Sequence, residues 1–451
     1  MAAPLVVAVE MGLGHLRAAA ALAGGLGQPL GQADCPPLAS VDETRLWTEA
    51  RRFYEGLSRL SQAAAVLGAP ARLLLGGVTR IPRLHPDRDQ SAASASARLI
   101  DGLIGRGLGA ALAEELRRTG APLLATHFIP ALAADRLGCR DVSCLVTDAD
   151  LARAWVRADP SRSAIRYFVA TDRAARRLAV YGVPTSHVAL TGFPLPDELV
   201  GGPDLPVARR NLARRLGRLD PRGSFRASHR AEVTARLGEA PADDSTAPLV
   251  VFAVGGAGAQ AHLPAQFLPS LRPRIEAGRL RLALLAGTRA DVARRFEALL
   301  VSYRLVGHPG ARVVREADQP PTFAASNALL AEADVLWTKP SELTFYAALG
   351  LPLVLSAPVG GQEVYNHRFA VEQGAGLAQR DPRFAGDWLI EWLESGTLAG
   401  AAWCGFTRLP KRGLYRIRES YEAAPGPGPP SAARFRAARA DGSTATRSIG
   451  S

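Results

Sequence analysis

Several residue types are scarce in this chain of 451 residues, and each scarcity excludes a class of protein. The four cysteines form no CxxC pair, which excludes a disulfide scaffold and a zinc ribbon and indicates reduced thiols. No apolar run reaches the ~20 residues that span a bilayer, so we expect no transmembrane helix. The amino terminus lacks a basic segment and Glu10 interrupts its apolar run, so we expect no signal peptide and a cytoplasmic location.

Lysine is almost absent, since 52 of the 54 basic residues are arginines and only Lys339 and Lys411 are lysines. Together with the alanine-rich runs, this composition indicates the coding bias of a GC-rich bacterial genome. The net charge of +12 would attract nucleic acid, anionic lipid or phosphorylated substrates. Because coding bias explains much of the arginine content, we rank a nucleic-acid binder last and expect no specific nucleic-acid partner.

Short apolar segments alternate with amphipathic stretches in two series, which is typical of parallel sheets covered by helices on both faces. The first series predicts strands at Leu5–Val9, Leu123–Thr126, Val142–Thr147, Ile165–Ala170 and Val188–Thr191. The second series predicts strands at Leu249–Val254, Leu282–Ala286, Val313–Val314, Val335–Trp337 and Leu353–Ser356. We therefore predict an α/β protein of two Rossmann-like, doubly wound parallel-sheet domains that face a cleft.

Changes in composition set the predicted domain boundaries. Residues 1–197 form the first domain and residues 249–423 the second, joined by a linker at 198–248 that is rich in Gly, Pro, Asp and Arg. Residues 424–451 lack the apolar side chains that would offset their ordering entropy, so we expect a disordered tail. Ligands of open sheets bind beyond the carboxyl ends of the strands, so we expect the site in the loops that follow them.

The loop after the first predicted strand contains Gly12, Gly14 and His15, directly before a helix. Glycines permit close backbone approach to a ligand, and a helix N-terminus attracts anions. No third glycine follows at the spacing of a dinucleotide fingerprint, which disfavours a hydride-transfer enzyme. The histidine suits a general base or an anion contact, and the alternative is a capping residue in a surface loop.

Two further segments of the second domain carry candidate ligand-binding groups. A strand-to-helix turn holds three glycines whose backbone N–H groups could bind a diphosphate: Gly255, Gly256 and Gly258. The segment after Val335–Trp337 includes Ser341, placed to cap a helix, and Glu342 in the first turn of that helix. A later glycine loop supplies donors and acceptors suited to sugar hydroxyls: Gln362, Glu363 and Asn366.

Four passages together resemble the GT-B-fold glycosyltransferases of family 28, which include monogalactosyldiacylglycerol synthases and the peptidoglycan N-acetylglucosaminyltransferases that act on lipid I. The passages are GLGHLRAAAALA, the stretch from VTDAD to TGFPLP, GGAGAQ, and TKPSELTFYAALGLPLVL with GGQEVYN. The resemblance covers most of residues 5–197 and 249–380. It implies inverting transfer from a nucleotide sugar, usually a UDP-sugar, held by the second domain, to an acceptor on the first. It further implies no essential metal and no cofactor besides this co-substrate.

The resemblance also assigns roles by position. The diphosphate would face Gly255, Gly256 and Gly258, and the nucleotide side would be lined by Thr338, Lys339 and Ser341. The transferred sugar or diphosphate would contact Gln362, Glu363 and Asn366. His15 and Asp148 match the acceptor-side histidine and the acidic residue of the TD motif, and are the candidate catalytic bases, with Gly12 and Gly14 beside them. Phe345 stands nearest the position of the family's ribose-binding Glu, so Glu342 is the carboxylate that could replace it.

Some interpretations stay open. His127 ends a predicted strand and is either an acceptor-side residue or a structural histidine. The stretch Arg45–Leu60 has apolar side chains at helical spacing with arginines off the stripe, which suits either a core-facing helix or contact with the inner face of the cell membrane. We accordingly leave two classes of acceptor open, a lipid and a small molecule. The alternative functions are a non-catalytic nucleotide-sugar binder and a nucleotide-sugar 2-epimerase.

Overall fold

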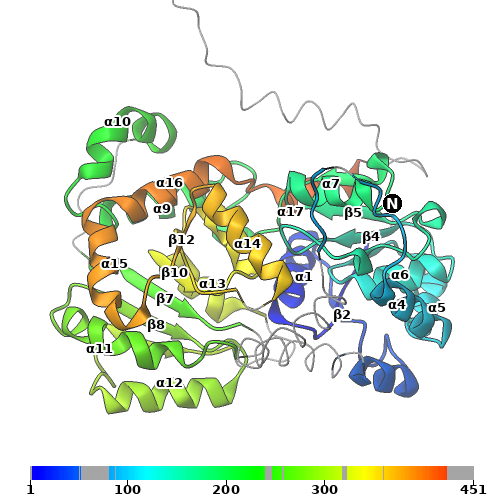
Figure 1. The fold of residues 1–451 in the computed structure, drawn as a ribbon, viewed down its shortest axis with the longest axis horizontal. Helices are drawn as coiled ribbons and strands as arrows, with labels where there is room; N and C mark the ends of the chain where they lie inside the picture. The colour runs from blue at the N-terminus through cyan, green and yellow to red at the C-terminus, as the bar shows by residue number, and fades with distance from the viewer. Residues whose placement is uncertain are drawn as a thin grey trace, which may run out of the picture.

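The computed structural model describes residues 3–49, 51, 81–86, 88–238, 246–255, 258–316, 322–358 and 360–423. These residues form two six-stranded sheets, and paired strands run parallel in both. Figure 1 shows the two sheets beside each other, each with helices packed around it. The prediction of an α/β protein with two doubly wound parallel sheets is confirmed.

The first sheet has the order β2-β1-β3-β4-β5-β6. Its strands are, in that order, Leu30–Gln32, Leu5–Ala8, Leu123–Ala125, Val142–Leu145, Arg166–Val169 and Val188–Leu190. The inner strands are almost wholly buried, because helices cover both faces and leave no polar side to the sheet. The helices of this half include α1 (Leu13–Leu26), α4 (Ala95–Gly105), α5 (Ala110–Thr119), α6 (Phe128–Arg136) and α7 (Asp172–Val180).

The second sheet has the order β12-β11-β10-β7-β8-β9. Its strands are, in that order, Gly376–Ala378, Leu353–Leu355, Val335–Thr338, Leu249–Ala253, Arg281–Leu285 and Ala311–Val314. Its helices include α11 (Leu263–Glu276), α12 (Ala290–Ser302), α13 (Ala324–Glu332), α14 (Gly361–Glu372), α15 (Ala385–Glu394) and α16 (Thr397–Arg408). A 3₁₀ helix, η4 (Glu342–Leu349), follows β10.

All ten predicted strands are present, and the sequence prediction missed β2 and β12. Both missed strands are three residues long, contain a glycine and lie at the outer edge of a sheet. An edge strand pairs on one side only, so it needs neither the length nor the continuous apolar run of a central strand.

The chain crosses between the two halves twice. The first crossing leaves β6 through α8 (Asp197–Val200), α9 (Pro206–Arg218) and α10 (Ser224–Leu237). The second leaves α16 for α17 (Gly413–Glu422), which packs on α1 although its residues fall in the range predicted for the second domain. The two crossings touch, since the Tyr415 hydroxyl lies 2.5 Å from Asp197 Oδ1 and accepts the Gly202 N–H at 2.8 Å.

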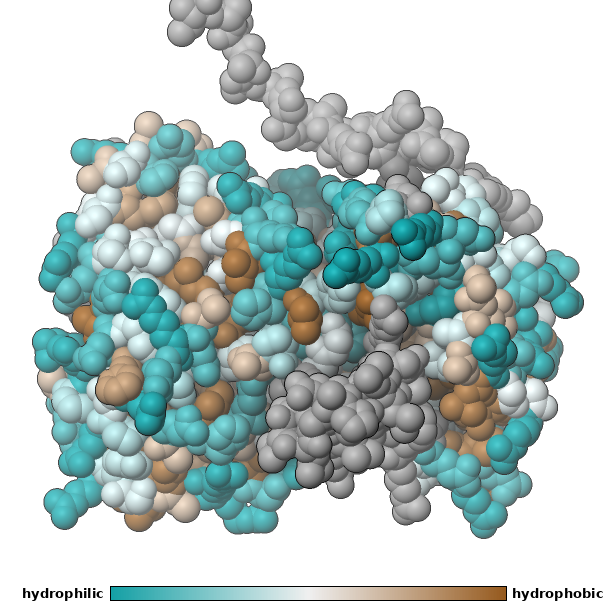
Figure 2. Space-filling model, viewed as in Figure 1, coloured by the Kyte–Doolittle hydropathy of each residue, from teal (hydrophilic) through white to brown (hydrophobic). Residues whose placement is uncertain are grey.

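Hydrophobic side chains on the face shown in Figure 2 occur in small groups between hydrophilic ones. None of the helices in the described ranges combines the length and apolar character needed to cross a membrane. The proposed surface helix Arg45–Leu60 lies mostly outside the described residues, and within its described part Trp47 is buried. The tail 424–451 also lies outside them.

Candidate active site at the junction of the two sheets

The first glycine turn places His15 at the start of α1. Gly12 adopts φ 118° at the N-cap position of α1, a conformation that side chains with a Cβ rarely take. This lets the chain turn sharply from β1 into α1, so that His15 lies in the first turn of the helix, beyond the carboxyl ends of β1 and β3.

Hydrogen bonds fix the His15 ring. Its Nδ1 lies 2.6 Å from the carbonyl oxygen of Thr126, and the Thr126 hydroxyl donates to the His15 carbonyl oxygen at 2.9 Å. A carbonyl oxygen only accepts, so Nδ1 carries the proton and Nε2 keeps a lone pair. Burial lowers the pKa of His15, outweighing the Thr126 hydrogen bond and the Glu342 charge, so the ring is neutral at pH 7. A neutral, oriented imidazole with a free Nε2 lone pair is what a general base requires.

His127 lies directly beside this ring. The two ring centroids are 4.6 Å apart at an interplanar angle of 81°. The His127 Nδ1 accepts the Ile129 N–H at 3.2 Å and so caps α6. Burial, with a smaller contribution from His15, holds the pKa of His127 well below its usual range. These contacts give His127 a structural role as a neutral helix cap that supports His15.

Asp148, the other candidate base, follows β4 next to Thr147, whose hydroxyl oxygen lies 3.4 Å from His15 Nδ1. Asp148 is partly exposed and accepts a hydrogen bond from Asn366 Nδ2 at 2.8 Å. Burial is the main cause that raises the pKa of Asp148 to about 6; the Asn366 hydrogen bond opposes it, while the charges of Glu342 and Glu363 add to it. Asp148 is therefore mainly ionised at pH 7 and can accept a proton.

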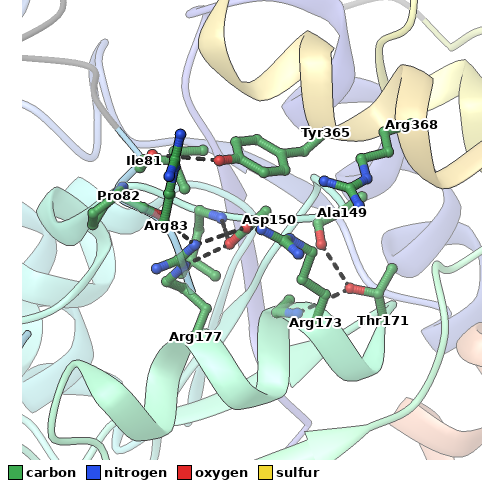
Figure 3. A network of polar contacts seen from close by, with 12 residues as sticks. Ile81, Pro82, Arg83, Ala149, Asp150, Thr171, Arg173, Arg177, Tyr365 and Arg368 are labelled. Atoms are coloured by element: carbon green, nitrogen blue, oxygen red, sulfur yellow. Dashed lines mark hydrogen bonds and ion pairs between the residues drawn. The ribbon is translucent and has the colours of Figure 1, made fainter. Parts of the chain in front are cut away.

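Buried ion pairs hold the loop that carries Asp148. Figure 3 shows Arg173 and Arg177 pointing from α7 toward Asp150, whose side chain is fully buried. Arg173 Nε donates to Asp150 Oδ2 at 2.6 Å and Arg177 Nε donates to Asp150 Oδ1 at 2.9 Å. The Thr171 hydroxyl donates to the Ala149 carbonyl oxygen at 2.7 Å. These residues were not predicted from the sequence, although two arginines four positions apart after a TDAD motif are a readable signal.

Asn366 connects the two halves of the molecule. Its side chain is fully buried and makes three hydrogen bonds: Nδ2 donates to Asp148 and to the Pro340 carbonyl oxygen at 3.2 Å, and Oδ1 accepts the Ala149 N–H at 2.7 Å. The sequence analysis assigned Asn366 to the sugar or diphosphate. In the structure its amide is used by protein groups from both sheets.

Lys339, Gly255 and Glu363, three of the predicted donor-site residues, lie close together on the second half. Lys339 Nζ lies 2.5 Å from Glu363 Oε1, and both side chains are mostly buried. A Cβ at Gly255 would lie 2.1 Å from Lys339 Cε, so a larger residue here would require the lysine side chain to shift. Gly258 adopts φ 70° in the same turn, and Gly256 lies outside the described residues.

Three donor-side candidates remain, Thr338, Ser341 and Gln362, and they differ in whether the side chain is used by the protein itself. The Thr338 hydroxyl is buried and donates to the Ala253 carbonyl oxygen at 3.2 Å, which is a structural contact. The predicted helix after Ser341 is present as the 3₁₀ helix η4, with Glu342 in its first turn. The Ser341 side chain makes no capping hydrogen bond, so the predicted cap is wrong. Gln362 is partly exposed and has no hydrogen-bond partner among the residues that the structure describes. Ser341 and Gln362, both partly exposed, are therefore open to a ligand, whereas Thr338 is not.

Glu342 reaches the first glycine turn. Its carboxylate pairs with Arg17 of α1 at 3.5 Å, and both side chains are almost fully buried. A Cβ at Gly14 would lie 3.0 Å from Glu342 Oε2, so this glycine permits the approach. The Arg17 guanidinium also lies 4.4 Å from the Phe323 ring centroid. Arg17 escaped the sequence analysis, although it is the only Arg, Lys, Asp or Glu in the alanine-rich helix α1.

No three His, Cys, Asp or Glu side chains in the described ranges are grouped as a metal site would require.

The contacts described above bring five candidate residues together at the junction: His15, Asp148, Lys339, Glu342 and Glu363. Asn366 is the bridge between the two halves.

Comparisons with known proteins concern the fold. A scan against protein-family models and a search of curated proteins both find no match. The crystal structure of MurG from Acinetobacter baumannii aligns at 14% identity and TM-score 0.50, covering 93% of this chain and 100% of that one. UDP-GlcNAc 2-epimerase from Neisseria meningitidis, bound to UDP-GlcNAc, aligns at 10% identity and TM-score 0.48, covering 93% and 99%. The glycosyltransferase SnogD from Streptomyces nogalater aligns at 12% identity and TM-score 0.44, covering 94% and 100%. The chain thus has the GT-B fold, as predicted.

Proposed function

We propose that this protein is an inverting glycosyltransferase that moves a sugar from a nucleotide sugar, with UDP as the nucleotide, to an acceptor hydroxyl. The observation that carries the proposal is the His15 ring, whose Nδ1 is bonded to the Thr126 carbonyl oxygen so that Nε2 can take a proton. A base held in this way lies across the junction from a lysine beside a glycine turn. The sequence resemblance to family 28 supports the same assignment.

In the proposed reaction the acceptor oxygen attacks the anomeric carbon of the donor from the face opposite the leaving group. The acceptor proton passes to His15 Nε2 or to Asp148, and the bond from the anomeric carbon to the diphosphate oxygen breaks. The departing diphosphate carries the negative charge. Lys339 and the backbone N–H groups of the second glycine turn would stabilise that charge, so that the transfer proceeds without a metal.

Donor binding would rearrange the hydrogen bonds at the junction. Lys339 pairs with Glu363 in the structure, and Glu342 pairs with Arg17. A diphosphate would replace Glu363 as the partner of Lys339, and Gln362 and Glu363 would then contact the sugar. We assign the ribose to Glu342 on the sequence resemblance. This role requires Glu342 to leave Arg17.

The acceptor is a lipid or a small molecule bound on the first half, and a lipid acceptor would place the protein at the inner face of the membrane. The donor-side residues Lys339 and Glu363 pair with each other in the structure. This pairing also fits a second function, in which the protein binds a nucleotide sugar without transferring the sugar. A nucleotide-sugar 2-epimerase would act on the donor with no acceptor.

The experiment is a thermal-stability panel with UDP-, GDP-, ADP- and dTDP-sugars, because a ligand that binds only the folded state raises the unfolding temperature. We expect a selective rise with UDP-sugars and slow release of UDP in the same samples. Lys339→Met should abolish the shift, while the control variant Arg210→Met, at an exposed position of α9, should keep it.

The outcomes separate the alternatives. A shift without UDP release, even with acceptor extracts, would identify the binder. Conversion of the sugar at its second carbon would identify the epimerase. No shift with any nucleotide sugar would refute the donor site itself.

A further inference from the structure

A second site candidate lies outside the junction. A pocket of about 300 Å³ opens between α9, α10 and the end of α16, and it shares no residue with the candidate active site. Figure 1 shows these three helices gathered at one end of the second half, with α10 projecting from the body. The volume is at the lower end of the range for small-molecule sites. The pocket therefore has room for a small ligand.

The lining combines cations with apolar side chains. The cations are Arg209, Arg236 and Lys411, and the apolar side chains are Leu205, Ala235 and Phe406. No carboxylate from the described part of the chain pairs with any of the three cations. Three like charges in one pocket repel one another, and an anion would remove this repulsion.

Lys411 is the most buried of these cations. Its ammonium donates to the carbonyl oxygen of Leu409 at 2.9 Å and to that of Phe406. The ammonium also lies 4.6 Å from the centroid of the Phe406 ring, which lines the same pocket. Burial, together with the smaller effect of the charges of Arg236, Arg412 and Arg209, lowers the pKa of Lys411 to about 8, and no acidic neighbour opposes this shift.

The choice of lysine at this position is itself informative. Lysine is rare in this chain, and Lys411 is one of only two lysines in the sequence, the other being Lys339. Lys339 stands in the proposed donor site with Glu363 as its partner. Lys411 has no such partner, and its compact ammonium suits a point contact with an anion.

The backbone of the pocket wall is strained. Leu205 adopts φ 61° and ψ 35°, the left-handed region, which is uncommon for a leucine and is often found at functional sites. Leu205 belongs to the first crossing between the two halves, and Lys411 belongs to the second. The crossings are joined nearby, where Arg412 Nε donates to the Pro203 carbonyl oxygen at 2.9 Å.

We infer that this pocket binds a phosphate group, with Arg209 and Arg236 as its arms and Lys411 at its base, and that the rest of the ligand lies on Leu205, Ala235 and Phe406. The ligand is a small phosphorylated molecule or a phospholipid headgroup, since both present the same chemistry. A ligand bound in this pocket would contact α9, α10 and the second crossing at the same time, and would so connect them. The proposal does not depend on the proposed transferase activity.

The test is hydrogen exchange of the full-length protein with and without pyrophosphate, read in peptides from 203–212 and 404–414. The proposed donor site is read separately in peptides from 336–344. We expect protection at the pocket peptides in the wild type, and at least a tenfold higher pyrophosphate requirement in R209Q/R236Q. The matched control is R210Q/R230Q, which removes the same charge from exposed positions of the same two helices and should behave as wild type.

A second arm replaces pyrophosphate with phosphatidylcholine vesicles with or without phosphatidylglycerol. Protection of the pocket by pyrophosphate identifies a free phosphorylated ligand. Protection by the anionic vesicles alone identifies a lipid headgroup. If neither probe protects the pocket, or if both double variants respond alike, the inference is wrong.

Discussion

The two sides of the junction are built differently. The acceptor-side cluster (His15, Thr126, His127 and Thr147) comes from the first sheet alone, and its hydrogen bonds fix the His15 ring in one tautomer. The donor-side cluster (Gly255, Lys339, Glu342, Glu363 and Asn366) makes several of its bonds to the opposite half. If the proposed function is correct, the first side is already arranged for proton transfer, whereas the second must exchange protein contacts for ligand contacts.

This difference separates two kinds of mutational effect. A change on the acceptor side should alter the rate and leave the packing of the two halves alone, because the base acts only in the transition state. A change on the donor side should alter stability as well as binding. The predictions below test this separation from the largest expected effect to the smallest.

The largest effect is expected for His15→Ala. Removal of a positioned general base lowers the rate by about 10²–10⁴-fold, so we expect transfer to fall by about 10³-fold. Donor binding should change less than twofold, because the donor-side cluster does not use the imidazole. Single-turnover transfer and nucleotide-sugar titration measure the two quantities. Equal loss of both would show that His15 is a structural or donor-binding residue.

The next effect concerns the buried pair of Glu342 and Arg17. Glu342→Gln leaves the Arg17 guanidinium buried without its counter-charge, and such a change costs about 3–5 kcal/mol. We expect the free energy of unfolding in urea to fall by about 3 kcal/mol. Glu332→Gln, at the exposed pair with Arg312, is the matched control and should have no measurable effect. Equal stabilities of the two variants would contradict a bridging role for Glu342.

Asp148→Asn should stabilise the protein in a pH-dependent way. The pKa of Asp148 is raised from 3.8 to about 6 in the folded state, so ionisation costs stability as the pH rises through this interval. Asparagine does not ionise and keeps an oxygen for Asn366. The variant should therefore exceed the wild type by about 1–3 kcal/mol at pH 8 and match it near pH 4, because one pKa unit is worth about 1.4 kcal/mol. Urea unfolding at both pH values measures this, and a gain that does not vary with pH would refute the raised pKa.

Much of the fold was predictable because central parallel strands need apolar runs, and β1, β4, β7 and β10 carry them. Parts of the site were predictable because glycines and histidines follow these strands. The partners of those residues were not, since Thr126 acts through its backbone carbonyl and Arg17 acts on a residue 325 positions away in the sequence. Asn366 was predicted to contact the sugar or diphosphate, whereas its use as a bridge depends on how the two halves meet.

The smallest effect is expected for His127→Asn, which tests whether the second histidine acts only through the first. Asparagine is a good N-cap residue, so α6 should keep its first turn and stability should change by less than about 1 kcal/mol. The ring contact with His15 is lost, so we expect a fall in the rate of less than tenfold with no change in donor binding. His127→Ala, which also removes the cap, should cost about 1 kcal/mol more stability. A fall in rate as large as that of His15→Ala would instead make His127 a catalytic residue.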